Sequence, residues 1–242
     1  MASGDVTTPR EPWFDRTRVI PFTSGAPAPY AVIHALQQRF LTERIASASG
    51  GPTVGAAADV VLIGEHERVI TLGRGSKGEP PLLPIPVVAV ERGGQATWHG
   101  PGQLVAYPIV ALEERGLSIR GYLRALEAAL IGTLVRFGLS GERRDGATGV
   151  WVGARKVASI GVAVRRHVSW HGVALNVTAD LADFRLIDPC GFSPEVMTSM
   201  ERLLAETGRV APKLGEVRDA LVTELARALH LAPPIWEKPA LA

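Results

Sequence analysis

Two β-rich runs, residues 156–164 and 169–177, are separated by only four residues, Arg165 to Val168. So short a connection predicts that the two runs pair as an antiparallel hairpin with its turn at Arg165–Val168. Paired residue numbers then add up to about 333, which places Lys156 near Val177. The fold must therefore contain an antiparallel sheet.

The rest of the chain mixes helices and strands without regular alternation. Apolar residues at helical spacing predict a helix from Ala31 to about Ala46 and a longer one between an N-cap at Ser118 and a C-terminal Gly138. Further strands are expected at residues 60–64, 68–72, 87–90, 104–110 and 149–152, and helical segments near 194–207 and 213–230. Because there is no repeat and no regular alternation, we expect an α+β domain around a mixed or largely antiparallel sheet flanked by helices.

The ends of the chain differ from its middle. Residues 1–29 are rich in Pro, Gly, Ser and Thr and show little periodicity, so we expect a flexible N-terminal arm. We assign residues 30–232 to one catalytic domain and residues 233–242 to a C-terminal tail.

Composition excludes several classes of protein. The chain has 242 residues and a net charge of +2, and this balance argues against a nucleic-acid binder. Its apolar runs are too short to span a bilayer, and its N-terminus has no signal pattern. The single cysteine, Cys190, cannot form an internal disulfide, so a cytoplasmic location is expected.

A glycine-rich stretch runs from Arg92 through His99 to Gly102, in the order Arg-Gly-Gly-Gln-Ala-Thr-Trp-His-Gly-Pro-Gly. Four glycines in this stretch allow either a close approach of the backbone to a ligand or a tight hairpin with His99 packed inside. The spacing matches neither common phosphate-binding motif.

The predicted hairpin carries small residues on alternate positions. Ser159, Gly161 and Ala163 share one face of the first strand, and Gly172, Ala174 and Asn176 share one face of the second, opposite His171 and Val173. If the two small-residue faces coincide, they form a groove for a linear aliphatic chain. The alternative is that they only make room for a packed helix.

Cys190 lies in a turn-rich segment, Asp188-Pro-Cys-Gly-Phe-Ser-Pro. Lone cysteines are often small buried residues, but a nearby ammonium lowers the thiol pKa and produces a nucleophile. Lys156 is the only lysine between Lys77 and Lys213, and Cys190 follows Val177 closely enough for the chain to return to it. A Cys190/Lys156 pair is therefore one hypothesis.

Several motifs together resemble one enzyme family. Arg92 to Tyr107, Lys156-Val-Ala-Ser-Ile-Gly161, His171-Gly-Val-Ala-Leu-Asn-Val177 and Pro189-Cys-Gly191 are similar to the lipoyl(octanoyl) transferases in order and spacing. Glu65-His66, ahead of Thr71-Leu-Gly-Arg74, agrees as well. The resemblance covers most of the chain from about Tyr30, and departs from the family at Glu67-Arg68 and His167.

This resemblance implies the fold of lipoate–protein ligase and biotin–protein ligase catalytic domains. It also implies transfer of an octanoyl group from acyl carrier protein to a lysine of lipoyl domains, in 2-oxo-acid dehydrogenase complexes or the glycine cleavage H protein. Cys190 would form the acyl thioester, and Lys156 would lower its pKa and act as general base. No metal, cofactor or nucleotide is expected, nor is a nucleic-acid or membrane partner. The resemblance assigns acyl-substrate contacts to Arg92, Gly93, Gly94, Gln95, Ala96, Thr97, Trp98, His99, Ser159, Ile160, Gly161, Gly172, Val173 and Ala174.

Three other functions remain open. An ATP-dependent lipoate or octanoate ligase would share the fold, but Cys190 at the matching position argues against it. An acyl-binding module would need neither Cys190 nor Lys156. A Cys/His hydrolase is the weakest alternative, because no histidine matches a base in the family pattern.

Overall fold

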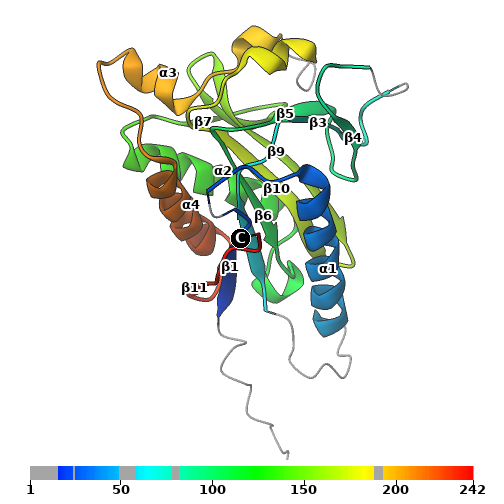
Figure 1. Ribbon diagram of the computed structural model, residues 1–242. Coiled ribbons are helices and arrows are strands. Elements are labelled where there is room, and N and C mark those ends of the chain that lie inside the picture. The colour runs from blue at the N-terminus through cyan, green and yellow to red at the C-terminus, as the bar shows by residue number, and fades with distance from the viewer. Residues whose placement is uncertain (1–15, 24, 49–57, 78–81, 188–192, 242) are drawn as a thin grey trace, which may run out of the picture.

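A mixed eight-stranded sheet forms the centre of the molecule (Figure 1). The computed structural model describes residues 16–23, 25–48, 58–77, 82–187 and 193–241. The strands run in the order β11-β1-β2-β6-β10-β9-β8-β7. Their bounds are β1 Thr17–Pro21, β2 Val60–Gly64, β6 Gln103–Ile109, β7 Glu142–Arg144, β8 Ala147–Val152, β9 Arg155–Arg165, β10 Val168–Asn176 and β11 Pro234–Trp236.

The sheet is parallel at one edge and antiparallel elsewhere. β11, β1 and β2 are parallel neighbours, whereas the pairs from β2 to β7 are antiparallel. The predicted mixed sheet is therefore correct. The predicted flexible arm is wrong for β1, and the predicted tail contains β11, because these two segments satisfy each other's backbone groups at the sheet edge.

Helices cover both faces of this sheet (Figure 1). They are α1 Tyr30–Ala48, α2 Ile119–Arg136, α3 Met200–Ala205 and α4 Leu214–Ala228. Alternate residues of each central strand enter opposite cores: Leu104 of β6 packs in the core with α2 and α4, whereas Val105 packs in the core with α1. Burial on both faces explains why β2 and β6 have few polar residues.

The predicted long helix has the expected ends. The Ser118 side chain accepts a hydrogen bond from the Gly121 amide at the N-terminus of α2, and Gly138 has a φ of +70° just after its end. The expected helix at 194–207 is shorter, because the 3-10 turn η5 (Pro194–Val196) precedes α3.

A second, three-stranded sheet lies near one end of α1 (Figure 1). It consists of β3 (Val69–Leu72) between β4 (Val87–Ala89) and β5 (Ala96–His99). It carries the glycine-rich stretch toward the α1 face of the main sheet. Across the described ranges, none of the helices is both long and apolar enough to span a membrane.

Candidate functional site

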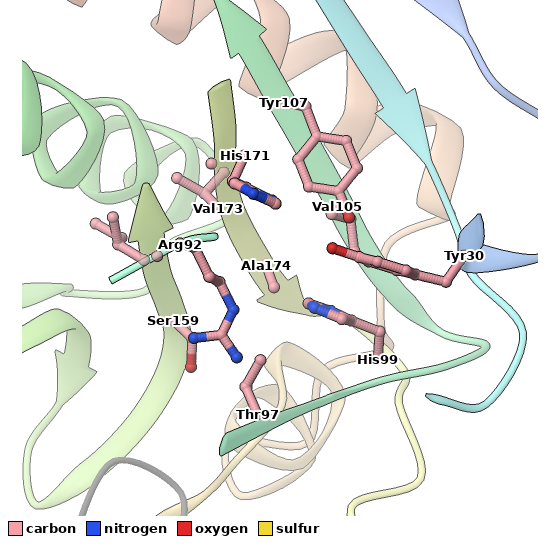
Figure 2. A pocket seen from close by; sticks show the side chains of 13 residues that line it. Tyr30, Arg92, Thr97, His99, Val105, Tyr107, Ser159, His171, Val173 and Ala174 are labelled. Atoms are coloured by element: carbon pink, nitrogen blue, oxygen red, sulfur yellow. The ribbon is translucent and has the colours of Figure 1, made fainter. Parts of the chain in front are cut away.

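A cavity opens between the hairpin β9–β10 and the three-stranded sheet (Figure 2). The hairpin register is the predicted one, with Val168 opposite Arg165. Ser159 consequently pairs with Ala174, and Gly161 with Gly172, so the two small-residue faces do coincide, which the sequence left open. All four of these residues line the cavity.

Two of these positions have no room for a side chain. A Cβ atom on Gly161 would come within 2.8 Å of Arg92 Cδ. A Cβ atom on Gly172 would come within 2.1 Å of the Ala106 carbonyl oxygen on β6. Glycine at 161 therefore lets the Arg92 side chain cross the hairpin, and glycine at 172 lets two strands approach closely.

The opposite wall comes from the glycine-rich stretch. Arg92, Thr97 and His99 point into the cavity (Figure 2). The Arg92 guanidinium is buried, and its Nη2 donates to the Thr71 carbonyl at 2.7 Å and to Thr71 Oγ1 at 2.9 Å. The cavity therefore has a fixed positive charge on one wall and small, mostly apolar groups on the other.

Neutral aromatic and imidazole rings close one end of the cavity. Tyr30 from α1 stacks on His99, and the Tyr107 hydroxyl donates to His66 Nε2 at 2.8 Å. Burial lowers the pKa of His66 to about 3, helped by His99 nearby, and burial likewise lowers the pKa of His99 to about 4. Both rings are thus uncharged at neutral pH. Burial also raises the pKa values of Tyr30 and Tyr107.

His171 departs from the predicted alternation. It was expected opposite Gly172 and Ala174, yet it lines the same cavity. Its φ of +54° lies in the left-handed region, which breaks the strand pattern. Pro108 of β6, which lacks an amide N–H, lies beside this point, and the His171 amide donates to Gln37 Oε1 at 3.1 Å instead of to a strand carbonyl.

A chain of buried hydrogen bonds leads from the cavity toward Lys156. His99 Nδ1 donates to Gln103 Oε1 at 2.7 Å, and Gln103 Nε2 donates to Asn176 Oδ1 at 2.9 Å. Asn176 Nδ2 then donates to the Thr198 carbonyl at 3.0 Å. The Thr198 amide donates to the Lys156 carbonyl at 2.9 Å. This network makes Nε2 the basic nitrogen of His99.

Lys156 is 2% exposed and lies outside the group of described residues that line the cavity. Its backbone forms a bridge with Met197, and its Nζ lies 5.8 Å from the centre of the Trp151 ring. Gly149, with a φ of +128°, makes room for it, since a Cβ there would come within 2.7 Å of Lys156 Cε. Cys190, the expected nucleophile, lies outside the described residues, so its pairing with Lys156 stays a prediction.

The other predicted contacts divide into two groups. Ile160 and Val173 also border the cavity, while packing with the α2–α4 core. The described cavity wall does not include Gly93, Gly94, Gln95, Ala96 or Trp98. Trp98 instead packs on Phe184 and donates to Asp183 at 2.9 Å, which anchors the small sheet.

Tyr30, Val105 and Tyr107 line the cavity without having been predicted. Strand alternation in β6 could have predicted Val105 and Tyr107, because both side chains point to the α1 face of the sheet. Nothing local in the sequence distinguishes Tyr30 from other residues at the start of a helix.

Comparison with known proteins places this architecture among lipoylation enzymes. Residues 29–226 match the lipoyl protein ligase A/B catalytic domain family. The octanoyltransferase of Geobacter metallireducens is 47% identical over 190 residues, covering 78% of this chain and 87% of the relative. The octanoyltransferase of Xylella fastidiosa is 43% identical over 201 residues, covering 82% of each chain.

Solved structures agree on the fold. Lipoate–protein ligase A bound with ATP superimposes with a TM-score of 0.66 at 18% identity, covering 92% of this chain and 88% of the other. A bipartite lipoate protein ligase from Thermoplasma acidophilum gives a TM-score of 0.56 at 16% identity, covering 92% and 86%. At these identities the likeness shows the fold alone, and it confirms the expected lipoate-ligase architecture.

Proposed function

This chain belongs to the octanoyltransferases of the lipoyl protein ligase A/B catalytic domain family, and from that premise we propose how it transfers octanoyl groups in protein lipoylation. The donor in this proposal is octanoyl–acyl carrier protein, and the acceptor is a lysine of a lipoyl domain. The acceptors would be 2-oxo-acid dehydrogenase complexes or the glycine cleavage H protein, in the cytoplasm.

The cavity is the observation that carries the proposal. The coincident small-residue faces of β9 and β10 leave a narrow apolar floor that suits an unbranched alkyl chain. Gly161 leaves room for the Arg92 stem, which forms a fixed wall of the cavity, and Gly172 lets β10 lie close to β6.

In the first half-reaction, the Cys190 thiolate attacks the thioester carbonyl of the donor. The tetrahedral oxyanion collapses, the carbon–sulfur bond to the carrier breaks, and the carrier leaves as a thiolate that takes up a proton. One thioester replaces another, so the step is nearly isoenergetic and requires no nucleotide. Preorganised donors must stabilise the oxyanion.

In the second half-reaction, the amine of the acceptor lysine attacks the acyl-enzyme. The nitrogen must lose a proton as the amide forms, and Cys190 leaves as a thiolate. We assign the proton to Lys156, which in its neutral form can accept it. The backbone bridge between Lys156 and Met197 supports this role, because Met197 follows Cys190 by seven residues in the chain.

Intact mass spectrometry tests the covalent step. The protein treated with apyrase and incubated with octanoyl–acyl carrier protein should gain one octanoyl mass, which hydroxylamine removes. Cys190→Ala should abolish both this adduct and transfer to a lipoyl domain. A Cys190→Ala protein that transfers at the wild-type rate would contradict the thioester mechanism.

The same experiment distinguishes the proposed octanoyltransferase from the alternative, an ATP-dependent ligase. An ATP-dependent octanoate ligase of this fold would require ATP and free octanoate, and would form octanoyl-adenylate. Transfer that stops completely after apyrase treatment and returns with ATP would assign the protein to that class.

A further inference from the structure

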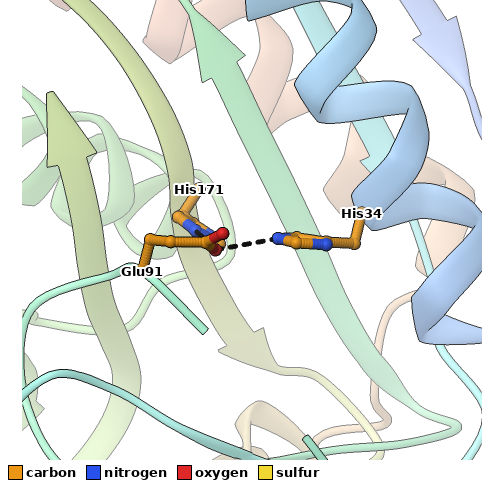
Figure 3. Close-up of side chains that lie close together, drawn as sticks. All are labelled: His34, Glu91 and His171. Carbon is orange, nitrogen blue, oxygen red and sulfur yellow. Dashed lines mark hydrogen bonds and ion pairs between the residues drawn. The ribbon is translucent and has the colours of Figure 1, made fainter. Parts of the chain in front are cut away.

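Three side chains from separate segments converge beside the cavity: His34 of α1, Glu91 before the glycine-rich stretch, and His171 of β10 (Figure 3). His34 Nε2 lies 2.9 Å from Glu91 Oε2, and His171 Nε2 lies 3.6 Å from the same oxygen. Across the whole group, one ligand atom per residue lies within 4.8 Å of the others. None of the three takes part in the chemical steps proposed above, although His171 lines the cavity.

The separations suit a metal ion. Zinc binds imidazole nitrogen and carboxylate oxygen at about 2.0–2.2 Å with tetrahedral geometry, which places neighbouring ligand atoms about 3.3 Å apart. The two separations from Glu91 Oε2 lie on either side of this value. Side-chain rotations that bring the two imidazoles, whose ligand atoms lie within 4.8 Å of each other, to this separation would complete the geometry.

His171 is the residue that needs a partner. Its side chain is 1% exposed, and Nε2 has no hydrogen-bond partner among the residues that the structure describes. A buried polar atom left in this state is costly, so natural structures rarely keep one without a purpose. Its position is fixed, because the left-handed backbone at His171 and the hydrogen bond from its amide to Gln37 hold the ring toward Glu91.

The charge of the group also fits a cation. The buried imidazole of His171 offers Nε2 as a nitrogen ligand, the kind that metal ions most often bind. Glu91 supplies an anionic oxygen and is 39% exposed, which leaves an entry path from solvent. Two imidazoles with one carboxylate suit zinc and related transition metals better than magnesium or calcium.

We propose that His34, Glu91 and His171 bind one Zn²⁺ ion per chain, with the fourth position open to water. The site would join α1, β10 and the segment leading into Arg92. Because His171 and Arg92 both line the cavity, an ion there would fix part of the cavity wall. We expect it to stabilise this wall and to take no part in the acyl transfer.

A binding experiment tests the site without measuring activity. The full chain, without a polyhistidine tag, carries Cys190→Ser so that the thiol does not bind metal. Titration with Zn²⁺ against a chromophoric chelator should give one ion per chain. Co²⁺ should produce the visible spectrum of a low-coordinate nitrogen–oxygen site without thiolate charge-transfer bands.

Substitutions then locate the ion. His34→Ala and Glu91→Gln should each weaken Zn²⁺ binding by roughly tenfold or more, since even outer-shell partners of a metal are worth 10–100-fold. His34→Gln keeps the side-chain volume and guards against a packing defect, and thermal melts without metal check that each variant folds. His167→Ala is the matched control, because His167 pairs with Glu113 at 3.0 Å on the surface.

The proposal is overturned if the parent protein binds no Zn²⁺ in competition with the chelator. It is equally overturned if His34→Ala and Glu91→Gln bind Zn²⁺ as tightly as the parent and the His167→Ala control. Neither result depends on whether octanoyl transfer proceeds as proposed.

Discussion

At Gly161, the absence of one side chain determines the shape of the cavity. A methyl group there would lie 2.8 Å from Arg92 Cδ, while the Arg92 head group is fixed by hydrogen bonds to Thr71. We expect Gly161→Ala to displace Arg92 and to weaken at least one of these bonds, which for a charged donor is worth about 1.5 kcal/mol. The kcat/KM for octanoyl transfer should fall by about tenfold, as measured with octanoyl–acyl carrier protein.

Gly215→Ala provides the control for this change. Gly215 lies in α4, and its Cβ would meet nothing within 4 Å. Alanine there should leave activity unchanged and raise stability slightly, by up to about 1 kcal/mol. If Gly161→Ala also leaves kcat/KM unchanged, the contact between Gly161 and Arg92 does not shape the acyl site.

Substitution of Lys156 separates the two roles proposed for it. Lys156→Arg keeps a positive charge, so acyl loading of Cys190 should remain detectable. Arginine does not readily lose its proton, so attack by the acceptor amine should slow by about 10²–10⁴-fold, typical of a lost general base. Single-turnover mass spectrometry should therefore detect accumulated acyl-enzyme.

Lys156→Met removes the charge as well and should also impair loading. Since Lys156 is buried against Gly149, a thermal melt must show that the bulkier arginine folds. Unchanged loading and transfer rates in Lys156→Arg would rule out Lys156 as the proton carrier. His99, whose Nε2 is the basic nitrogen, would be the next candidate.

Sequence patterns predicted much of the cavity wall, except where the backbone of β10 departs from regular strand geometry. Ser159, Gly161, Gly172 and Ala174 could be assigned to one wall because a short turn fixes the hairpin register. His171 could not, because strand alternation assumes an ordinary φ and His171 has +54°. Pro108 of a different strand lies beside this irregularity, and no local pattern around His171 reveals that neighbour.

At the scale of elements, a buried ion-pair cluster holds α1 against the sheet. Asp59, just before β2, has a fully buried side chain, and its oxygens accept from Arg44 of α1 at 2.8 Å and from Arg115 at 2.7 Å. We expect Asp59→Ala to lower the free energy of unfolding by about 3 kcal/mol, because it removes the buried carboxylate that pairs with Arg44 and Arg115 and leaves Arg44 only the half-exposed Glu114. Urea denaturation measures the change.

Arg39→Ala is the comparison for this cluster. Arg39 lies on α1 too, but its side chain is 58% exposed and pairs with Glu43 at 3.6 Å. Such exposed pairs contribute about 0.3–0.5 kcal/mol. Equal effects of Asp59→Ala and Arg39→Ala would mean that the buried cluster does not stabilise the docking of α1.

Helices and strands that are marked by local sequence patterns were predicted correctly. Strands that form only by pairing with segments distant in the chain were not predicted. The N-cap at Ser118, the helical spacing of apolar residues and Gly138 together predict α2 from the sequence. β1 and β11 are short strands held by partners distant in sequence: β1 lies between β2 and β11, with Thr17 opposite Pro234, and β11 pairs with β1. Pairing between segments so far apart in sequence produces no periodic pattern in either one. The sequence therefore predicts a proline-rich arm and a tail instead.

At the scale of the whole molecule, the sheet is covered on both faces, and this burial extends to groups that titrate near neutral pH. His66 and His99 are 0% and 6% exposed, and their rings lie 5.8 Å apart. Each is held by a specific hydrogen bond, His66 to Tyr107 and His99 to Gln103. Protonating either ring in the folded protein would place a buried positive charge near that of Arg92.

This arrangement makes the fold sensitive to mild acid. The pKa values of His66 and His99 are lowered to about 3 and about 4, below the ordinary value of 6.5 that applies when the chain unfolds. The unfolded chain therefore binds more protons below pH 6.5. Their stabilising contribution is complete above that pH and is lost as the pH falls toward 4. By pH 5 the loss should be roughly 2 kcal/mol per histidine.

Urea denaturation at pH 7.5, 6.0 and 5.0 measures this loss, and His99→Gln should reduce its slope because one titrating ring is removed. His167→Gln should keep the parent slope, since the side chain of His167 is 69% exposed. A free energy of unfolding that is the same at pH 7.5 and pH 5.0 would mean that these rings accept protons in the folded state. The closed end of the cavity would then be wet, and an octanoyl chain would have to displace water there in order to bind.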